Sequence, residues 1–181
     1  MPPFNKSPNH PILMTEVWQR GPVANIPPLL QPVAHTLLQA REEVQALIAL
    51  LDDDKLWNRP AGVASPAFHL KHLSGVLDRL FTYARAESLS QHQLKQLADE
   101  ALSYDSQVNI AALLERFHAQ VDVAIQQLTQ TQEQTLTDYR PVGRQQLPST
   151  VIGLLFHAAE HTMRHVGQLR VTVKIIMNDE L

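Results

Sequence analysis

Three histidines follow one another at four-residue steps near the end of the chain: His157, His161 and His165. They lie in an otherwise apolar stretch, and a second pair, His69 and His72, lies in the apolar stretch AFHLKHLSGVL. Each imidazole carries two polar nitrogens that need partners when the side chain is buried. Because a metal ion can satisfy several imidazoles at once, these residues indicate a metal site.

The spacing predicts which of these histidines could share one ion. An α-helix turns about 100° per residue, which places His161 and His165 in the middle of the apolar stripe of their helix and His157 at its edge. Neighbours in the series are ~6 Å apart along the axis and the outer two ~12 Å, so one ion takes His161 with one neighbour, and the periodicity favours His165. His69 and His72 both lie within ~60° of their own apolar stripe, so spacing does not choose between them as the third ligand.

Two other interpretations of the same residues stay open. The histidines could be structural, with hydrogen bonds to the backbone or to each other. Alternatively, His157-Ala-Ala-Glu160-His161 matches the H-x-x-E-H pattern of inverted zinc peptidases, with Glu160 as the base. Such enzymes need a further ligand well downstream, and only 20 residues follow His161, Glu180 among them. We interpret this five-residue match as coincidence, because short motifs recur by chance.

Three other side chains and one pair of tryptophans complete the candidates. Arg140 and Arg144 could bind an anionic substrate, since guanidinium groups grip carboxylates, although a structural tie or ordinary solvation is the favoured interpretation. Gln168, three residues after His165, could orient a metal ligand or could hydrogen-bond across the fold. Trp18 and Trp57 are predicted to be structural.

Composition limits the classes of function. The chain has 181 residues, enough for one domain with a substantial core, and 44% of them are hydrophobic. A formal net charge of −3 without a Lys/Arg cluster argues against nucleic-acid binding. No apolar run approaches the ~20 residues that span a bilayer, and the N-terminus lacks the apolar stretch of a secretory signal. The chain has no cysteine, so it offers no disulfide, thiolate ligand or cysteine nucleophile, and we expect a cytoplasmic protein.

The apolar periodicity predicts an all-α fold with the histidines on two of its helices. Residues 1–28 are rich in proline and are expected to form an irregular arm, followed by a domain over residues 29–178. No β pattern appears. Four long amphipathic helices pack most simply as a four-helix bundle with a ligand site in its core. We expect these helices over about 29–51, 66–86, 106–129 and 149–177, a short helix within 88–105, and a long polar connection over 131–148.

With these residues in view, the chain resembles the DinB-like superfamily, whose members are regarded as metalloenzymes. The resemblance runs from about Glu16 to Thr172, and its sharpest part is EHTMRHVGQL, similar to the family's closing H-x-x-x-H-x-G-Q helix. A second match is HLKHLSG after Ser65, where the family places its other ligand at the later histidine. The resemblance therefore implies a metal site made of His72, His161 and His165.

The resemblance also implies a function. Members of the DinB-like superfamily form four-helix bundles, often dimeric, that bind one divalent ion such as nickel or zinc through three histidines. Some are thiol-dependent transferases or isomerases, so the leading hypothesis is a transferase that uses a low-molecular-weight thiol. The alternatives are a metal-dependent hydrolase and a non-catalytic metal-binding stress protein. The expected partners are a small-molecule substrate and a second copy of the chain, with no nucleic acid and no membrane.

Overall fold

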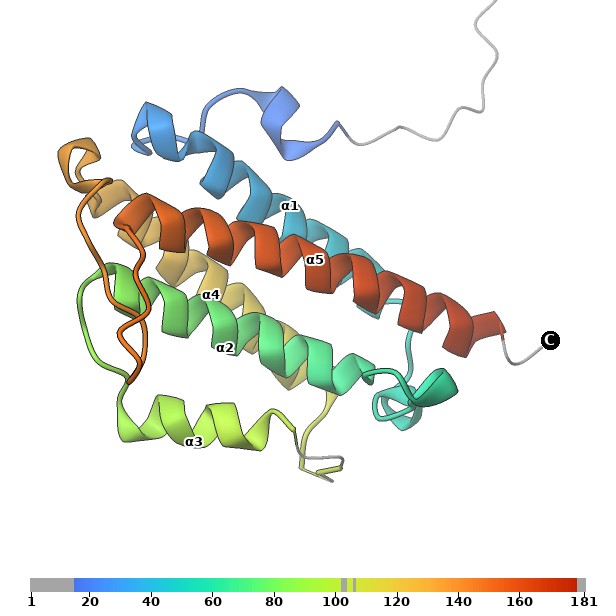
Figure 1. Ribbon diagram of the computed structural model, residues 1–181. Coiled ribbons are helices and arrows are strands. Elements are labelled where there is room, and N and C mark those ends of the chain that lie inside the picture. Colours follow the sequence, from blue (N-terminus) through green and yellow to red (C-terminus); the bar gives the residue numbers. More distant parts are fainter. Residues whose placement is uncertain (1–14, 102–103, 106, 179–181) are drawn as a thin grey trace, which may run out of the picture.

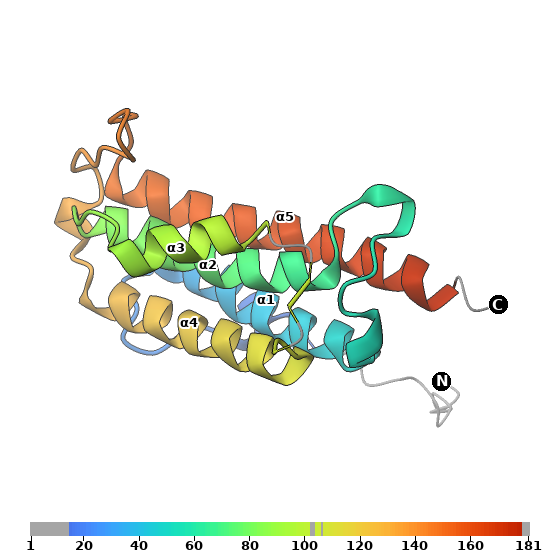
Figure 2. The same cartoon turned by 90° about the horizontal axis from the view of Figure 1, so that it is seen from below.

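The computed structural model describes residues 15–101, 104–105 and 107–178, and every regular element in this part of the chain is a helix, with no β-strand. Four long helices run roughly alongside one another, and a fifth, shorter helix lies outside them (Figures 1 and 2). The four long helices are α1 (Gln31–Ile48), α2 (Pro66–Ala84), α4 (Ile110–Gln130) and α5 (Val151–Asn178). The short helix is α3 (Gln91–Asp99). The predicted fold class, an all-α bundle, is confirmed.

Each long helix of the bundle packs against two others. Helix α2 contacts α4 and α5, and α1 contacts the same two helices from the opposite side. Their facing side chains form one apolar core, with Leu37, Leu77, Phe117 and Leu169 among its fully buried members. The histidine-bearing helices α2 and α5 are therefore direct neighbours, so residues about 90 positions apart in the sequence share one seam.

Local capping explains where the helices begin. Ser65 Oγ accepts a hydrogen bond from Phe68 N, and Pro66 occupies the first position of α2, as the sequence predicts. The prediction that α4 begins near Ser106 is wrong, because Asn109 caps it by accepting from Ala112 N; Ser106 itself lies outside the described residues. Helix α5 begins at Val151. The residue before it, Thr150, caps the first turn, because its Oγ1 accepts a hydrogen bond from Gly153 N.

The polar connection before α5, residues 131–148, contains local backbone pairing. Two isolated antiparallel bridges, Tyr139 with Thr150 and Val142 with Leu147, fold it back on itself. Arg140 Nε donates to the carbonyl oxygen of Ala84 at 3.0 Å, at the end of α2. Arg140 is thus a structural tie, in agreement with the favoured interpretation of that residue.

The described part of the N-terminal arm packs on α1. A short 3₁₀ helix, Val17–Arg20, buries Val17, and Arg20 pairs with Glu42; the prolines at positions 2, 3, 8 and 11 lie outside the described residues. Trp57 is half-buried against Tyr104, as a structural residue should be. Trp18 is 61% exposed, and its Nε1 donates a hydrogen bond to Glu16 Oε2. Over the described ranges, no helix is long and apolar enough to cross a membrane.

Candidate metal centre

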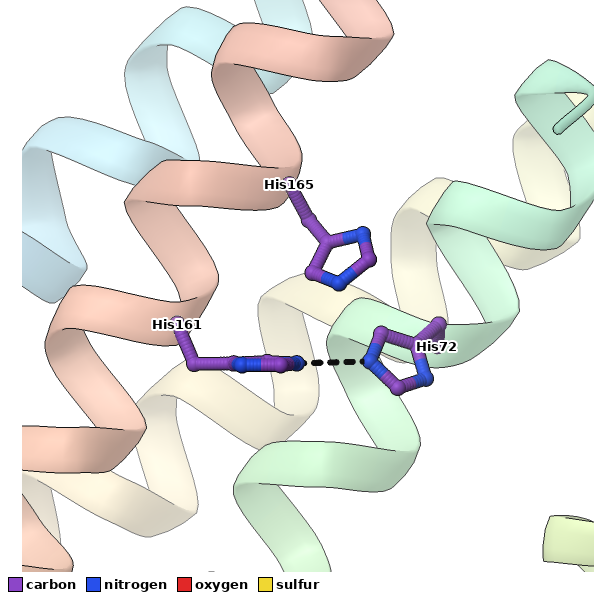
Figure 3. A group of neighbouring side chains, drawn as sticks. All are labelled: His72, His161 and His165. Atoms are coloured by element: carbon purple, nitrogen blue, oxygen red, sulfur yellow. Dashed lines mark hydrogen bonds between the residues drawn. The ribbon is translucent and has the colours of Figure 1, made fainter. Parts of the chain in front are cut away.

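The seam between α2 and α5 brings three imidazoles together. His72 from α2 meets His161 and His165 from α5, one turn apart on that helix (Figure 3). One ring nitrogen from each residue can be chosen so that all three lie within 4.8 Å of one another. The ring centroids of His72 and His165 are 4.3 Å apart, and those of His161 and His165 4.6 Å. All three side chains are half-buried, so the cluster lies at the edge of the core and not in its middle.

The spacing of these nitrogens suits a small cation. His72 Nε2 lies 2.9 Å from His161 Nε2. Bonds of about 2.1 Å to one ion would place two neighbouring nitrogens about 3.0 Å apart at a right angle and about 3.4 Å apart at the tetrahedral angle. Only a small separation of the His72 and His161 rings is therefore needed to admit an ion. Three nitrogen donors with no thiolate form a donor set that could hold a divalent metal ion.

The outer nitrogen of His72 is held by a buried carboxylate. His72 Nδ1 donates to Glu100 Oε2 at 2.8 Å, and Glu100 also accepts from Arg79 Nη1. Only 8% of the Glu100 side chain is exposed. Burial raises the pKa of Glu100, but the hydrogen bonds from His72 and Arg79 outweigh this effect. The pKa of Glu100 is therefore below its ordinary value, and the carboxyl group is ionised at neutral pH. With its proton on Nδ1, His72 presents the free lone pair of Nε2 to the cluster.

His69 contacts His165 on the side that faces away from the other two clustered histidines. Its Nδ1 lies 3.2 Å from His165 Nδ1, so the two rings share a proton there, and His165 turns its other nitrogen toward His72 and His161 (Figure 3). His69 is buried and is not one of the three clustered residues. The two α2 histidines thus differ in position: His72 faces the cluster, and His69 contacts the back of one of its rings.

Burial favours the neutral form of His69, His161 and His165. The pKa of His69 and that of His165 are lowered to about 4, mainly by burial and in smaller part by the nearby His72. The pKa of His161 is also lowered, mainly by burial and then by His72 and His157. A histidine must be deprotonated to bind a metal, so this environment favours binding at neutral pH.

His161 has one unsatisfied atom. Its Nδ1 is buried and has no hydrogen-bond partner among the described residues, while its Nε2 faces His72. Because His72 Nε2 can only accept, His161 Nε2 carries the shared proton, which leaves Nδ1 as an unpaired acceptor. The purely structural interpretation leaves this atom without a partner. An ion at Nε2 would move the proton to Nδ1.

The peptidase-like pattern does not assemble. The side chain of His157 is 51% exposed, and Glu160 accepts hydrogen bonds from Arg164 on the outer face of α5, including one of 2.9 Å from Nε. The downstream candidate, Glu180, lies outside the described residues. His157 therefore does not join His161 at the cluster, and the pattern is a consequence of helix composition.

A groove adjoins the cluster on the side of His69. It has a volume of about 540 Å³ and lies between the C-terminal half of α5 and the segment that leads into α2. Gln168 lines this groove and does not contact the histidine rings through any hydrogen bond seen in the described part of the chain. Arg144 lines a separate hollow near the end of α2. The walls of the groove include apolar Val63, Val171 and Ile175, and polar His69, Arg164 and Gln168.

Glu100 is the residue that sequence reasoning missed. It stands in the connection between two long helices, in a segment with no apolar periodicity and no spacing relation to the histidines. The available signal was weak: a carboxylate at the end of the short helix expected within 88–105. Its partner, His72, is 28 residues away, and only the packing of α3 on α2 brings the two together.

These features define a helical bundle with three imidazoles at one seam, backed by a carboxylate and a fourth histidine. The profile of the DinB superfamily matches residues 36–169, which include all three clustered histidines. The chain therefore belongs to the DinB superfamily, as the resemblance predicted.

A solved structure supports the fold. A conserved protein from Enterococcus faecalis is similar, with a TM-score of 0.67 and 19% sequence identity, over 83% of this chain and 98% of that protein. At this level of identity the likeness concerns the fold alone. A search of curated protein sequences finds no match.

Proposed function

We propose that the protein is a metal-dependent enzyme in which His72, His161 and His165 hold one divalent ion, nickel or zinc, for transfer of a low-molecular-weight thiol to an electrophile. The observation that carries this proposal is the convergence of three imidazoles from two helices, with one ring nitrogen of each within 4.8 Å of the others. Three protein ligands leave coordination positions for a substrate, as catalytic sites do and closed structural sites do not.

Two further features are compatible with thiol chemistry. The chain contains no cysteine, so a sulfur nucleophile has to come from outside. A bound divalent ion supplies positive charge that lowers the pKa of a nearby thiol and favours the thiolate. The protein's own residues orient the imidazoles: Glu100 fixes the proton of His72 on Nδ1, and His69 holds the back of His165.

The groove beside His69 offers room for the organic part of a substrate. Its apolar residues Val171 and Ile175 are 58% and 38% exposed, which is costly for such side chains and typical of ligand-binding surfaces. Gly167, which lines the groove, has open space where a Cβ would be. A substrate lying in the groove would contact His69, which in turn contacts His165.

The test combines metal analysis with turnover. Protein purified without an affinity tag or chelator is expected to carry close to one ion per chain, and to consume model electrophiles only when a low-molecular-weight thiol is added. Turnover without any thiol would replace transfer by metal-dependent hydrolysis. A tightly held ion that exchanges no ligand and supports no turnover would replace it by a non-catalytic metal-binding role. Absence of bound metal under all loading conditions would refute the proposal.

A further inference from the structure

Helix α3 is the only described α-helix outside the bundle, and it contacts α2 (Figure 2). None of its nine residues is buried, and its two leucines, Leu94 and Leu97, are 38% and 43% exposed. Glu100, the residue immediately after the helix, is buried. Apolar packing therefore contributes little to the docking of α3, and its attachment depends on polar contacts.

Those polar contacts concentrate at the C-terminal end of α3. Lys71 Nζ donates to the carbonyl oxygen of Asp99 at 2.8 Å. Glu100 lies between His72 Nδ1 and the guanidinium of Arg79, in a contact that includes both carboxylate oxygens. At the N-terminal end, a single hydrogen bond of 2.9 Å joins Gln93 Nε2 to Thr82 Oγ1.

The surface of α2 is shaped to receive this carboxylate. Gly75 stands opposite Glu100, and a Cβ atom there would overlap Glu100 Oε1 and lie 2.6 Å from Arg79 Nη1. The missing side chain lets the carboxylate approach the helix backbone and reach His72 one turn away. Arg79 compensates the buried negative charge, so Glu100 can remain ionised and accept from His72.

We infer that Glu100 is a positioning residue that couples metal binding at His72 to the docking of α3; this inference rests on the metal site proposed above. A carboxylate bonded to the outer nitrogen of a ligating histidine fixes its tautomer and orientation and makes it a better ligand. Whenever α3 is docked, His72 has this partner, and whenever α3 is detached, His72 loses it. Metal affinity and α3 docking must then favour each other by the same factor, because linkage between two equilibria is reciprocal.

The first experiment compares the metal affinity of the wild type with that of Glu100→Gln, by competition of Zn²⁺ or Ni²⁺ against a chromophoric chelator. Loss of the carboxylate is expected to weaken binding 10- to 100-fold, or about 1.4–2.7 kcal/mol. Lys95→Ala is the matched control on the same helix, because it removes only an exposed ion pair with Asp99. It is expected to bind metal like the wild type.

A second variant separates positioning from simple loss of charge. Gly75→Ala keeps every charged group but displaces the carboxylate of Glu100, so it is expected to weaken metal binding in the same direction as Glu100→Gln. The far-ultraviolet circular dichroism of each metal-free variant verifies that the bundle is intact. Equal affinities in the wild type and in both variants would overturn the inference.

Hydrogen exchange tests the coupling itself, because a purely structural role of Glu100 would not make the protection of the α3 amides depend on metal. In the wild type, the amides of α3 are expected to exchange more slowly after Zn²⁺ is added, and this metal-dependent protection should vanish in Glu100→Gln. Protection that is the same with and without metal in the wild type would refute the coupling. If the wild type binds no metal at all, the proposed function fails together with this inference; if it binds metal independently of Glu100, only the inference fails.

Discussion

The metal-free protein should lose stability between pH 6.5 and pH 4, because of its buried histidines. The pKa of His69 is lowered to about 4, mainly by burial, whereas an unfolded chain titrates this residue near its ordinary value of 6.5. On acidification the unfolded state therefore binds the proton first. The contribution of His69 to stability is complete above pH 6.5 and is lost as the pH falls toward 4.

The size of this loss follows from the two pKa values. Each pKa unit corresponds to about 1.4 kcal/mol, so His69 costs about 2 kcal/mol at pH 5 and about 3 kcal/mol once the pH has passed 4. His165 has a similarly lowered pKa, but it is half-buried and touches His69, so it adds less than the same amount again. Against a total stability of roughly 5–15 kcal/mol, this loss is large enough to measure.

Urea unfolding at pH 7.5 and pH 5, with a chelator present, measures this difference directly. The matched variant is His69→Gln, which keeps a polar side chain of comparable size but does not titrate. It should lose about 2 kcal/mol less than the wild type over the same pH interval. If the wild type and the variant lose the same free energy of unfolding, the assignment of acid sensitivity to the buried imidazoles is wrong.

Three further results are expected. His161→Ala should remove stoichiometric metal, since one of three ligands is lost, whereas His157→Ala, at an exposed position on the same helix, should retain it in elemental analysis. Zn²⁺ at 100 times its dissociation constant should stabilise the protein by about 2.7 kcal/mol, seen as a raised Tm that a chelator reverses; an unchanged Tm would contradict binding to the folded state. Gly167→Phe should fill the groove and raise KM in the thiol-transfer assay with metal content unchanged, while Gly167→Ala, which fits the open space, should not.

The sequence predicted the bundle and two of its clustered histidines from helical periodicity. His161 and His165 lie where the apolar stripe of their helix places them, and the N-cap at Ser65 is where residue preferences put it. Periodicity could not separate His69 from His72, because both lie near the same stripe. The separation depends on how α2 rotates against α5, which is a property of packing between elements and not of either helix alone.

Glu100 marks the limit of prediction from local pattern. Apolar periodicity reports residues that face a core, whereas Glu100 is buried by a polar contact between a short helix and Arg79 and His72. The glycine that makes room for it, Gly75, looks like an ordinary helix position in the sequence. Such sites are set by long-range contacts, and only a three-dimensional structure shows them.

Burying the polar imidazoles of the cluster costs folding free energy, and this cost is relevant to the question of what the cluster does. Replacing these imidazoles by leucine or alanine would remove buried polar atoms from the α2–α5 seam, including the unpartnered Nδ1 of His161. The lowered pKa values of His161 and His165 add no such cost well above pH 6.5, where both rings are neutral in the folded and in the unfolded chain, but they penalise protonation in acid. A metal ion binds only neutral imidazole, so protons compete less for these nitrogens here than at an exposed histidine. The burial that makes the metal-free fold sensitive to acid is therefore the same burial that favours metal binding at neutral pH.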